Sequence, residues 1–186
     1  MIISLSGKPG SGKSTVAEKL SAALGYDRIY IGAMRREMAK KRGMTLAEFN
    51  AWSEHHEEGD KEFDAYIEKI GKERDNFVIE GRTAFHFIPH SIKVFLEVDL
   101  PTAAKRIYHD ARIHERNEAH RLSSVEDVQR SLTERINSDR LRYEKYYHLD
   151  TYDHGHYDLV VDTSGKTIDQ VYGIIMNFLK NKGTIA

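Results

Sequence analysis

Short runs of apolar and aromatic residues recur along the chain, separated by longer segments of mixed polarity. Runs of this length, rich in Ile, Val, Leu and Phe, are typical of the buried strands of a parallel sheet. They occupy residues 1–6, 26–31, 77–79, 93–98 and 157–161. Because helical segments separate all five, the pattern predicts a three-layer α/β fold, in which helices cover both faces of a five-stranded parallel sheet.

The intervening segments carry apolar residues at helical spacing. In the first of them, Val16, Leu20 and Leu24 share one face, and Gly25 supplies the stop. The predicted helices cover residues 15–24, 33–42, 45–53, 61–73, a segment with Pro101 in its first turn, 124–147 and 168–180. Thr45 and Glu48 form the pattern of a capping box for one of these helices. The helices between the second and third strands predict an arm over about residues 32–75, within a single domain.

The first strand leads into Gly-Lys-Pro-Gly-Ser-Gly-Lys-Ser at residues 7–14, which fits the phosphate-loop pattern G-x-x-x-x-G-K-[ST]. Its glycines allow successive backbone N–H groups to point at phosphate oxygens, and the helix that follows adds its positive end. Lys13 can reach the outer phosphates, and the Ser14 hydroxyl can bind a magnesium ion. The residues predicted to bind ATP are Gly7, Lys8, Pro9, Gly10, Ser11, Gly12, Lys13, Ser14 and Thr15. The flanking strand and helix favour nucleoside triphosphate binding over a chance glycine-rich turn.

Composition excludes several classes of chemistry. The 186 residues contain no cysteine, so a disulfide framework, a thiolate zinc site and a catalytic thiol are all excluded. The N-terminus enters the first strand directly, and no apolar run approaches the length of a membrane span. We therefore expect a soluble, cytoplasmic monomer with no nucleic-acid or membrane partner.

Other polar and aromatic residues allow two interpretations each. His109, His114 and His120 are spaced by five and six, which does not align them on one helical face, so solvated residues are favoured over a metal site. Trp52 is expected to pack inside the arm, and stacking on a nucleotide base is the alternative interpretation. Glu80 at a strand end could hold a magnesium-bound water or cap a turn.

Arginine is concentrated late in the chain. Residues 106–142 contain eight of the fourteen arginines and no lysine. Arg135, Asp139 and Arg142 fall at i, i+4 and i+7, so they project from one face of a helix, where Asp139 can hold either arginine. A solvated helix laced with charges is one interpretation. The phosphate loop favours the other, in which these guanidinium groups neutralise charge during phosphoryl transfer.

The motifs taken together resemble the nucleoside monophosphate kinases, and more closely the cytidylate kinases of the archaeal type. The matching segments are residues 7–14, Gly32, 36–39, 42–44, 48–49, 80–82, 135–143 and 157–164. They span nearly the whole chain, in order and at compatible spacing. The resemblance implies ATP-dependent phosphorylation of a nucleoside monophosphate with Mg²⁺, and it favours CMP or dCMP. It also implies an acceptor-binding arm at about residues 32–75, a lid at about 109–124, and a core formed by 1–31, 76–108 and 125–186.

The resemblance also implies roles for individual residues. Those expected to bind the acceptor are Arg36, Gly81, Arg82, Arg106, Arg135, Asp139 and Arg142, with Asp139 as an orienter or base contact. Those expected to act in catalysis are Lys13, Arg112, Arg116 and Arg142, with Arg112 and Arg116 on the lid. Ser14 is the expected metal ligand, and Thr163 and Ser164 resemble the loop that carries the adenine of ATP.

Alternatives stay open at the level of the acceptor. UMP, AMP or a small metabolite could replace CMP, because the chain has Ala65-Tyr-Ile67 where relatives tend to have Arg-Arg-Gln, and the stretch 108–124 exceeds a typical lid. A non-catalytic switch of the GTPase kind is a less favoured alternative. It would need Asn-Lys-x-Asp, and the nearest string, at residues 181–184, lacks the aspartate.

Overall fold

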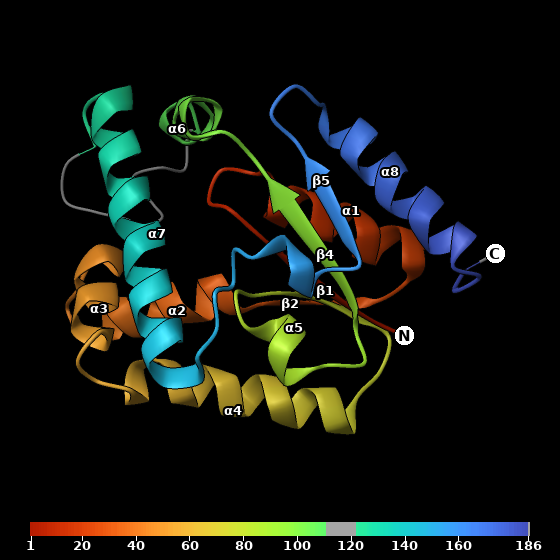
Figure 1. The fold of residues 1–186 in the computed structure, drawn as a ribbon, viewed down its shortest axis with the longest axis horizontal. Helices are drawn as coiled ribbons and strands as arrows, with labels where there is room; N and C mark the ends of the chain where they lie inside the picture. The colour runs from red at the N-terminus through yellow and green to blue at the C-terminus, as the bar shows by residue number, and fades with distance from the viewer. Residues whose placement is uncertain (111–121, 186) are drawn as a thin grey trace.

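The computed structural model describes residues 1–110 and 122–185. Its centre is a five-stranded sheet in the order β2-β3-β1-β4-β5, and every neighbouring pair of strands is parallel (Figure 1). The strands are β1 (Ile2–Gly7), β2 (Asp27–Tyr30), β3 (Phe77–Glu80), β4 (Ile92–Glu97) and β5 (Leu159–Asp162). This arrangement confirms the predicted α/β fold with five parallel strands.

The strand register brings the carboxyl ends of the strands to one edge of the sheet. Gly7 at the end of β1 pairs with Leu96 of β4, and Tyr30 at the end of β2 pairs with Glu80 at the end of β3. In α/β sheets, ligands bind beyond this edge. The phosphate loop follows β1 directly and therefore starts at the place where a ligand is expected.

Helices cover both faces of the sheet (Figure 1). They are α1 (Lys13–Leu24), α2 (Ile31–Lys41), α3 (Leu46–Ser53), α4 (Glu58–Glu73), α5 (Ala84–Phe87), α6 (Leu100–Tyr108), α7 (Val125–Tyr147) and α8 (Ile168–Asn181), with a 3₁₀ turn η1 at His154–His156. Along β1 the side chain of Ile3 packs in the cluster formed with α1 and α8, whereas Ile2 packs with α2, α4 and α5. This alternation follows from the pleat of a strand and gives the fold two apolar layers.

Helix α7 is the longest element and joins three parts of the molecule. It packs against α6 through Val128 and Leu132, and it also contacts α3 (Figure 1). Ser124 caps its first turn by accepting from the backbone N–H of Asp127, which agrees with the predicted start. The helix therefore reaches from the region after α6 to the arm helices.

Helix and strand boundaries differ from the predictions by a few residues. The Thr45–Glu48 capping box is confirmed, with both hydrogen bonds present. Helix α4 begins at Glu58 instead of residue 61, and Ile31 opens α2 instead of closing β2. The short elements α5 and η1 were not predicted, because four and three residues are too few to display a period. Among the described residues, no helix combines the length and apolar character of a membrane span.

Candidate functional site

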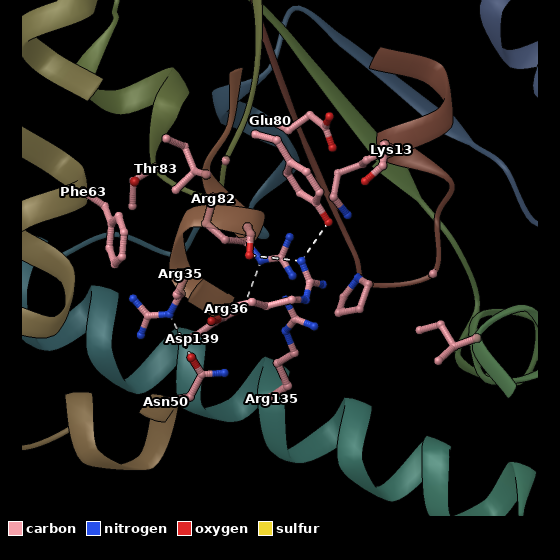
Figure 2. A pocket seen from close by; sticks show the side chains of 18 of the residues that line it. Lys13, Arg35, Arg36, Asn50, Phe63, Glu80, Arg82, Thr83, Arg135 and Asp139 are labelled. Carbon is pink, nitrogen blue, oxygen red and sulfur yellow. Dashed lines mark hydrogen bonds and ion pairs between the residues drawn. The ribbon is translucent and has the colours of Figure 1, made fainter. Parts of the chain in front are cut away.

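A cavity of about 230 Å³ opens beyond the carboxyl edge of the sheet. The phosphate loop and the start of α1 form one of its ends. Residues of α2 and α7 and the segment after β3 form its middle, and residues of α3 and α4 line its other end (Figure 2). Segments far apart in the sequence thus meet around one space, as a site for two substrates requires.

Close backbone approach explains the glycines of the phosphate loop. Gly7 has φ 138° and Gly10 has φ 78°, values that residues with a side chain rarely adopt. A Cβ at Gly7 would lie 2.2 Å from the carbonyl oxygen of Leu96, and one at Gly10 would lie 2.8 Å from the Cα of Ala103. The loop is therefore packed tightly between β4 and α6, and only glycine fits at these two positions.

Lys13 lies inside the loop and faces other cations. Its Nζ donates to the carbonyl oxygens of Gly7 at 2.8 Å and Lys8 at 2.6 Å. Burial lowers the pKa of Lys13 well below its ordinary value, and the positive charges of Arg82 and Arg135 lower it further. An anion bound among these cations would relieve their repulsion. The electrostatics at this end of the cavity thus favour a polyphosphate.

Glu80 and Ser14 offer oxygen atoms beside the loop. The Glu80 side chain is 2 % exposed and its Oε1 accepts from Arg28 Nε at 2.7 Å. Its Oε2 is buried with no hydrogen-bond partner among the described residues. Both Glu80 and Ser14 line the cavity. A carboxylate oxygen and a hydroxyl are ligands that a hard cation accepts, directly or through water, so these residues fit the expected Mg²⁺.

Three of the expected acceptor arginines meet in the middle of the cavity (Figure 2). Arg36 on α2 donates to Tyr30 Oη at 2.8 Å and to the Gly32 carbonyl oxygen at 3.0 Å. Arg82, after β3, donates to the Gly7 carbonyl oxygen at 2.7 Å. Arg135 on α7 lines the same space, as does Gly81. The structure therefore places guanidinium groups from three elements in front of the phosphate loop.

Arg142 occupies a different place from the one that the resemblance implied. Its side chain is fully buried and is absent from the described lining of the cavity. It donates to Asp60 on α4 at 2.5 and 2.6 Å and to Asp139 at 2.5 Å. In the structure Arg142 is thus bound to two carboxylates behind the lining of the cavity, and its expected contact with a phosphate stays a prediction.

Asp139 connects Arg142 to Arg82. Its Oδ2 accepts from Arg82 Nε at 2.9 Å and from Tyr152 Oη at 2.8 Å. Although burial alone would raise it, the pKa of Asp139 is held well below its usual value by Arg82 and Arg142. Asp139 is therefore ionised and holds Arg82 in place, in line with the role of orienter.

Arg106 lines the cavity on the side of the phosphate loop. Its guanidinium group donates to the Thr163 carbonyl oxygen at 2.6 Å and Oγ1 at 3.1 Å, and to the Gly10 carbonyl oxygen at 3.4 Å. It thus links the phosphate loop to the segment after β5, and its expected contact with the acceptor stays a prediction. The expected lid residues Arg112 and Arg116 lie outside the described residues.

Sequence reasoning missed the far end of the cavity, which is formed by Arg35, Asn50, Asp60, Phe63, Asp64 and Thr83. Arg35 donates to Asn50 Oδ1 at 2.9 Å and to Asp60 Oδ1 at 2.8 Å. Asp60 and Asp64 are one helical turn apart, next to the inward-facing Phe63. The sequence signal that could have identified this end of the cavity was the pair of carboxylates beside the apolar face of a predicted helix. Charged groups are rarely buried without a partner, so such a pair indicates a site.

Comparison with known proteins agrees with this geometry. The model of the cytidylate kinase-like family matches residues 2–165. The cytidylate kinase of Pyrococcus furiosus is 35% identical over 176 residues, covering 94% of this chain and 86% of the relative. The cytidylate kinase of Methanocaldococcus jannaschii is 33% identical over 186 residues, covering 97% of this chain and 98% of the relative.

Solved structures share the fold at lower identity. An uncharacterized protein from Eubacterium ventriosum has a TM-score of 0.67 at 20% identity, and the match covers 97% of this chain and 98% of that protein's chain. A shikimate kinase from Bacteroides thetaiotaomicron has a TM-score of 0.62 at 16% identity, with the same coverage. From the family model, the relatives and the cavity in front of the phosphate loop, we conclude that the chain belongs to the cytidylate kinase-like family.

Proposed function

We propose that this protein transfers the terminal phosphoryl group of ATP to a nucleoside monophosphate, and that CMP or dCMP is the acceptor. The observation that carries the proposal is the convergence of Arg36, Arg82 and Arg135 on the cavity in front of the phosphate loop. One end suits a triphosphate, and the middle suits a second phosphate. Family membership supports the same reaction.

The arrangement accounts for catalysis by positioning and charge neutralisation. The phosphate loop and Lys13 hold the donor phosphates, while the three arginines hold the acceptor phosphate in front of them. Phosphoryl transfer leaves little covalent chemistry to the protein, so alignment and compensation of charge supply most of the rate. A general base is unnecessary, because the acceptor phosphate is already an anion at neutral pH.

Mg²⁺ is part of the proposal. Ser14 would hold it through the hydroxyl, and Glu80 through a water molecule or through Oε2, which has no hydrogen-bond partner among the described residues. When bound, Mg²⁺ neutralises charge on the outer phosphates. No group of three or more His, Asp or Glu suited to a metal occurs in residues 1–110 and 122–185. The expected cytoplasmic location, monomeric state and lack of a nucleic-acid partner stay predictions.

An acceptor panel tests the function. The purified protein is incubated with ATP and Mg²⁺, either alone or with CMP, dCMP, UMP or AMP, and both ADP and the nucleoside diphosphate are measured. We expect ADP to form only with an acceptor, and fastest with CMP or dCMP. ADP formation at the same rate without an acceptor, or tight GTP and GDP binding without turnover, would contradict the proposal.

A further inference from the structure

The position of the phosphate-binding groups fixes where the acceptor's base must lie. In Figure 2 the guanidinium groups of Arg36, Arg82 and Arg135 lie between Lys13 and the side chains of Phe63 and Thr83. An acceptor phosphate held by these arginines has the donor on one side. The nucleoside must therefore extend to the other side, into the end lined by Phe63, Asp64 and Thr83.

Asp64 gives this end of the cavity a defined hydrogen-bonding character. Its Oδ1 accepts from Thr83 Oγ1 at 2.6 Å, and its Oδ2 accepts from Tyr147 Oη at 2.5 Å. Both hydroxyl protons are thus directed at the carboxylate. Burial and the bond to Asp64 raise the pKa of Tyr147, so this hydroxyl keeps its proton. The group formed by Asp64, Thr83 and Tyr147 can therefore accept a hydrogen bond from a ligand, but neither hydroxyl has a proton left to donate to one.

The carboxylate keeps capacity for a further donor. An ionised carboxyl group has about four lone-pair sites, of which the two hydroxyls use two. The nearby cation Arg35 is bound by Asp60, Asn50 and the Gly59 carbonyl oxygen, and none of the ion pairs between described residues includes Asp64. Asp64 is 5 % exposed, yet it lines the cavity. A buried carboxylate in this state favours a ligand that brings an N–H group.

We propose that Asp64 accepts a hydrogen bond from the exocyclic amino group of the acceptor's base, and so selects cytosine over uracil. This inference rests on the proposed function and names the residue that determines its specificity. Cytosine presents an amino group at C4, where uracil presents a carbonyl oxygen. In uracil that oxygen would face the Asp64 carboxylate with no proton between them, at a side chain that is only 5 % exposed.

Substrate analogues test the inference on the unaltered protein. The wild-type enzyme is assayed for kcat/KM with CMP, with UMP, and with the 5′-monophosphate of pyrimidin-2-one riboside, which lacks the C4 amino group. We expect CMP to exceed each of the other two by at least about 100-fold. If the analogue without the amino group is phosphorylated as well as CMP, or UMP as well as CMP, the inference is wrong.

Replacing the carboxylate tests the same contact from the protein side. Asp64→Asn keeps an acceptor oxygen for one hydroxyl but adds an NH₂ group that can donate to the O4 of uracil. We expect its kcat/KM for CMP to fall about 100-fold, while the value for UMP stays equal or rises. Asp169→Asn, a change of the same kind on the exposed face of α8, should leave the CMP/UMP ratio unchanged.

The outcomes separate this inference from the proposed function. If the wild-type protein phosphorylates none of the nucleoside monophosphates, the proposed function itself fails. If it phosphorylates them and Asp64→Asn leaves the CMP/UMP ratio unchanged, the function stands and the role of Asp64 is refuted. Circular dichroism of the variant shows whether it folds, and the analogue series on the wild type decides the question if it does not.

Discussion

Arg82 holds two groups together that belong to opposite sides of the proposed reaction. Its guanidinium group binds the Gly7 carbonyl oxygen at the start of the phosphate loop and the Asp139 carboxylate on α7. It lines the cavity between the loop and the acceptor end. Its position suits a cation that holds the acceptor phosphate in front of the donor phosphates.

The first prediction concerns this residue. Arg82→Ala should lower kcat/KM for the acceptor about 100- to 1000-fold, because the charge contact that positions the acceptor phosphate for transfer is lost. The dissociation constant of ATP should change less than about threefold, since the loop amides and Lys13 remain. Steady-state kinetics and equilibrium binding of a fluorescent ATP analogue measure the two effects.

The control for Arg82→Ala is Arg74→Ala. Arg74 is a surface arginine that pairs with Asp27 on the outside of the molecule. Its replacement should change neither kinetics nor ATP binding measurably. An equal loss of ATP affinity and of transfer in Arg82→Ala would show that Arg82 anchors the donor, and would contradict its assigned role.

At the scale of elements, buried ion pairs join α7 to the arm. Asp60 on α4 binds Arg142 of α7 and Arg35 of α2, and Arg35 also binds Asn50 of α3. Isolated buried charges are costly, whereas paired charges with good geometry are tolerated. The pairs therefore fix the relative position of four helices more than they add net stability.

The second prediction separates the two roles considered for Arg142. Arg142→Met should lower the free energy of unfolding by about 3 to 5 kcal/mol, because Asp60 and Asp139 lose a buried partner. Urea denaturation measures the change. The matched control is Arg140→Met on the same helix. Its half-exposed side chain pairs with Asp150 at 3.6 Å and lies over the Tyr152 ring at 5.4 Å, so the loss should stay at or below about 1 kcal/mol. Unchanged stability with lost phosphoryl transfer would instead support direct phosphate contact by Arg142.

Elements with their own local signal could be predicted from the sequence, and long-range pairings could not. The phosphate loop and the capping box at Thr45 are defined by residues a few positions apart. The shared face of Arg135, Asp139 and Arg142 was also predictable from helical spacing. The sequence did not predict which of these three side chains line the cavity. The position of Arg142 depends on its pairing with Asp60, which is 82 residues away. The position of Asp64 in the cavity was not predictable for the same reason, because its partners Thr83 and Tyr147 lie in other segments of the chain.

At the scale of the whole molecule, one titrating group should affect stability near neutral pH. Burial raises the pKa of Asp64 to about 6 from its ordinary 3.8. An acid with a raised pKa in the folded state stabilises the fold fully below its unfolded pKa, and this contribution is lost as pH rises through the folded pKa. The contribution of Asp64 to the free energy of unfolding therefore decreases between about pH 4 and pH 6, and slightly beyond.

The third prediction compares wild type with Asp64→Asn across that window. Between pH 5 and pH 8, the free energy of unfolding of the wild type should fall by about 1 to 2 kcal/mol relative to the variant. Groups that titrate in both proteins cancel in the difference. Urea denaturation at several pH values measures it. A difference that stays constant, or that grows in favour of the wild type as pH rises, would show that burial does not raise the pKa of Asp64.

The overall sheet followed from the sequence because each strand contains a short run rich in apolar or aromatic residues and lies between helical segments. The strand order could not be deduced in the same way, since it depends on which side of β1 each crossing helix carries the chain. The order places β3 and β4 next to β1. That adjacency sets the segment after β3, with Arg82, directly beside the phosphate loop.

The shared carboxylate of Asp60 has a mechanical consequence. The Asp60 carboxylate on α4 binds Arg35 of α2 and Arg142 of α7, and Arg35 extends the connection to Asn50 of α3, so the arm is tied to α7 and does not tilt as a free flap. Any closure over an acceptor must therefore move α7 as well, and with it Arg135, which lines the same cavity. Occupancy by one nucleotide would in this way be communicated to the other through a rigid lever, with no need for the two ligands to touch.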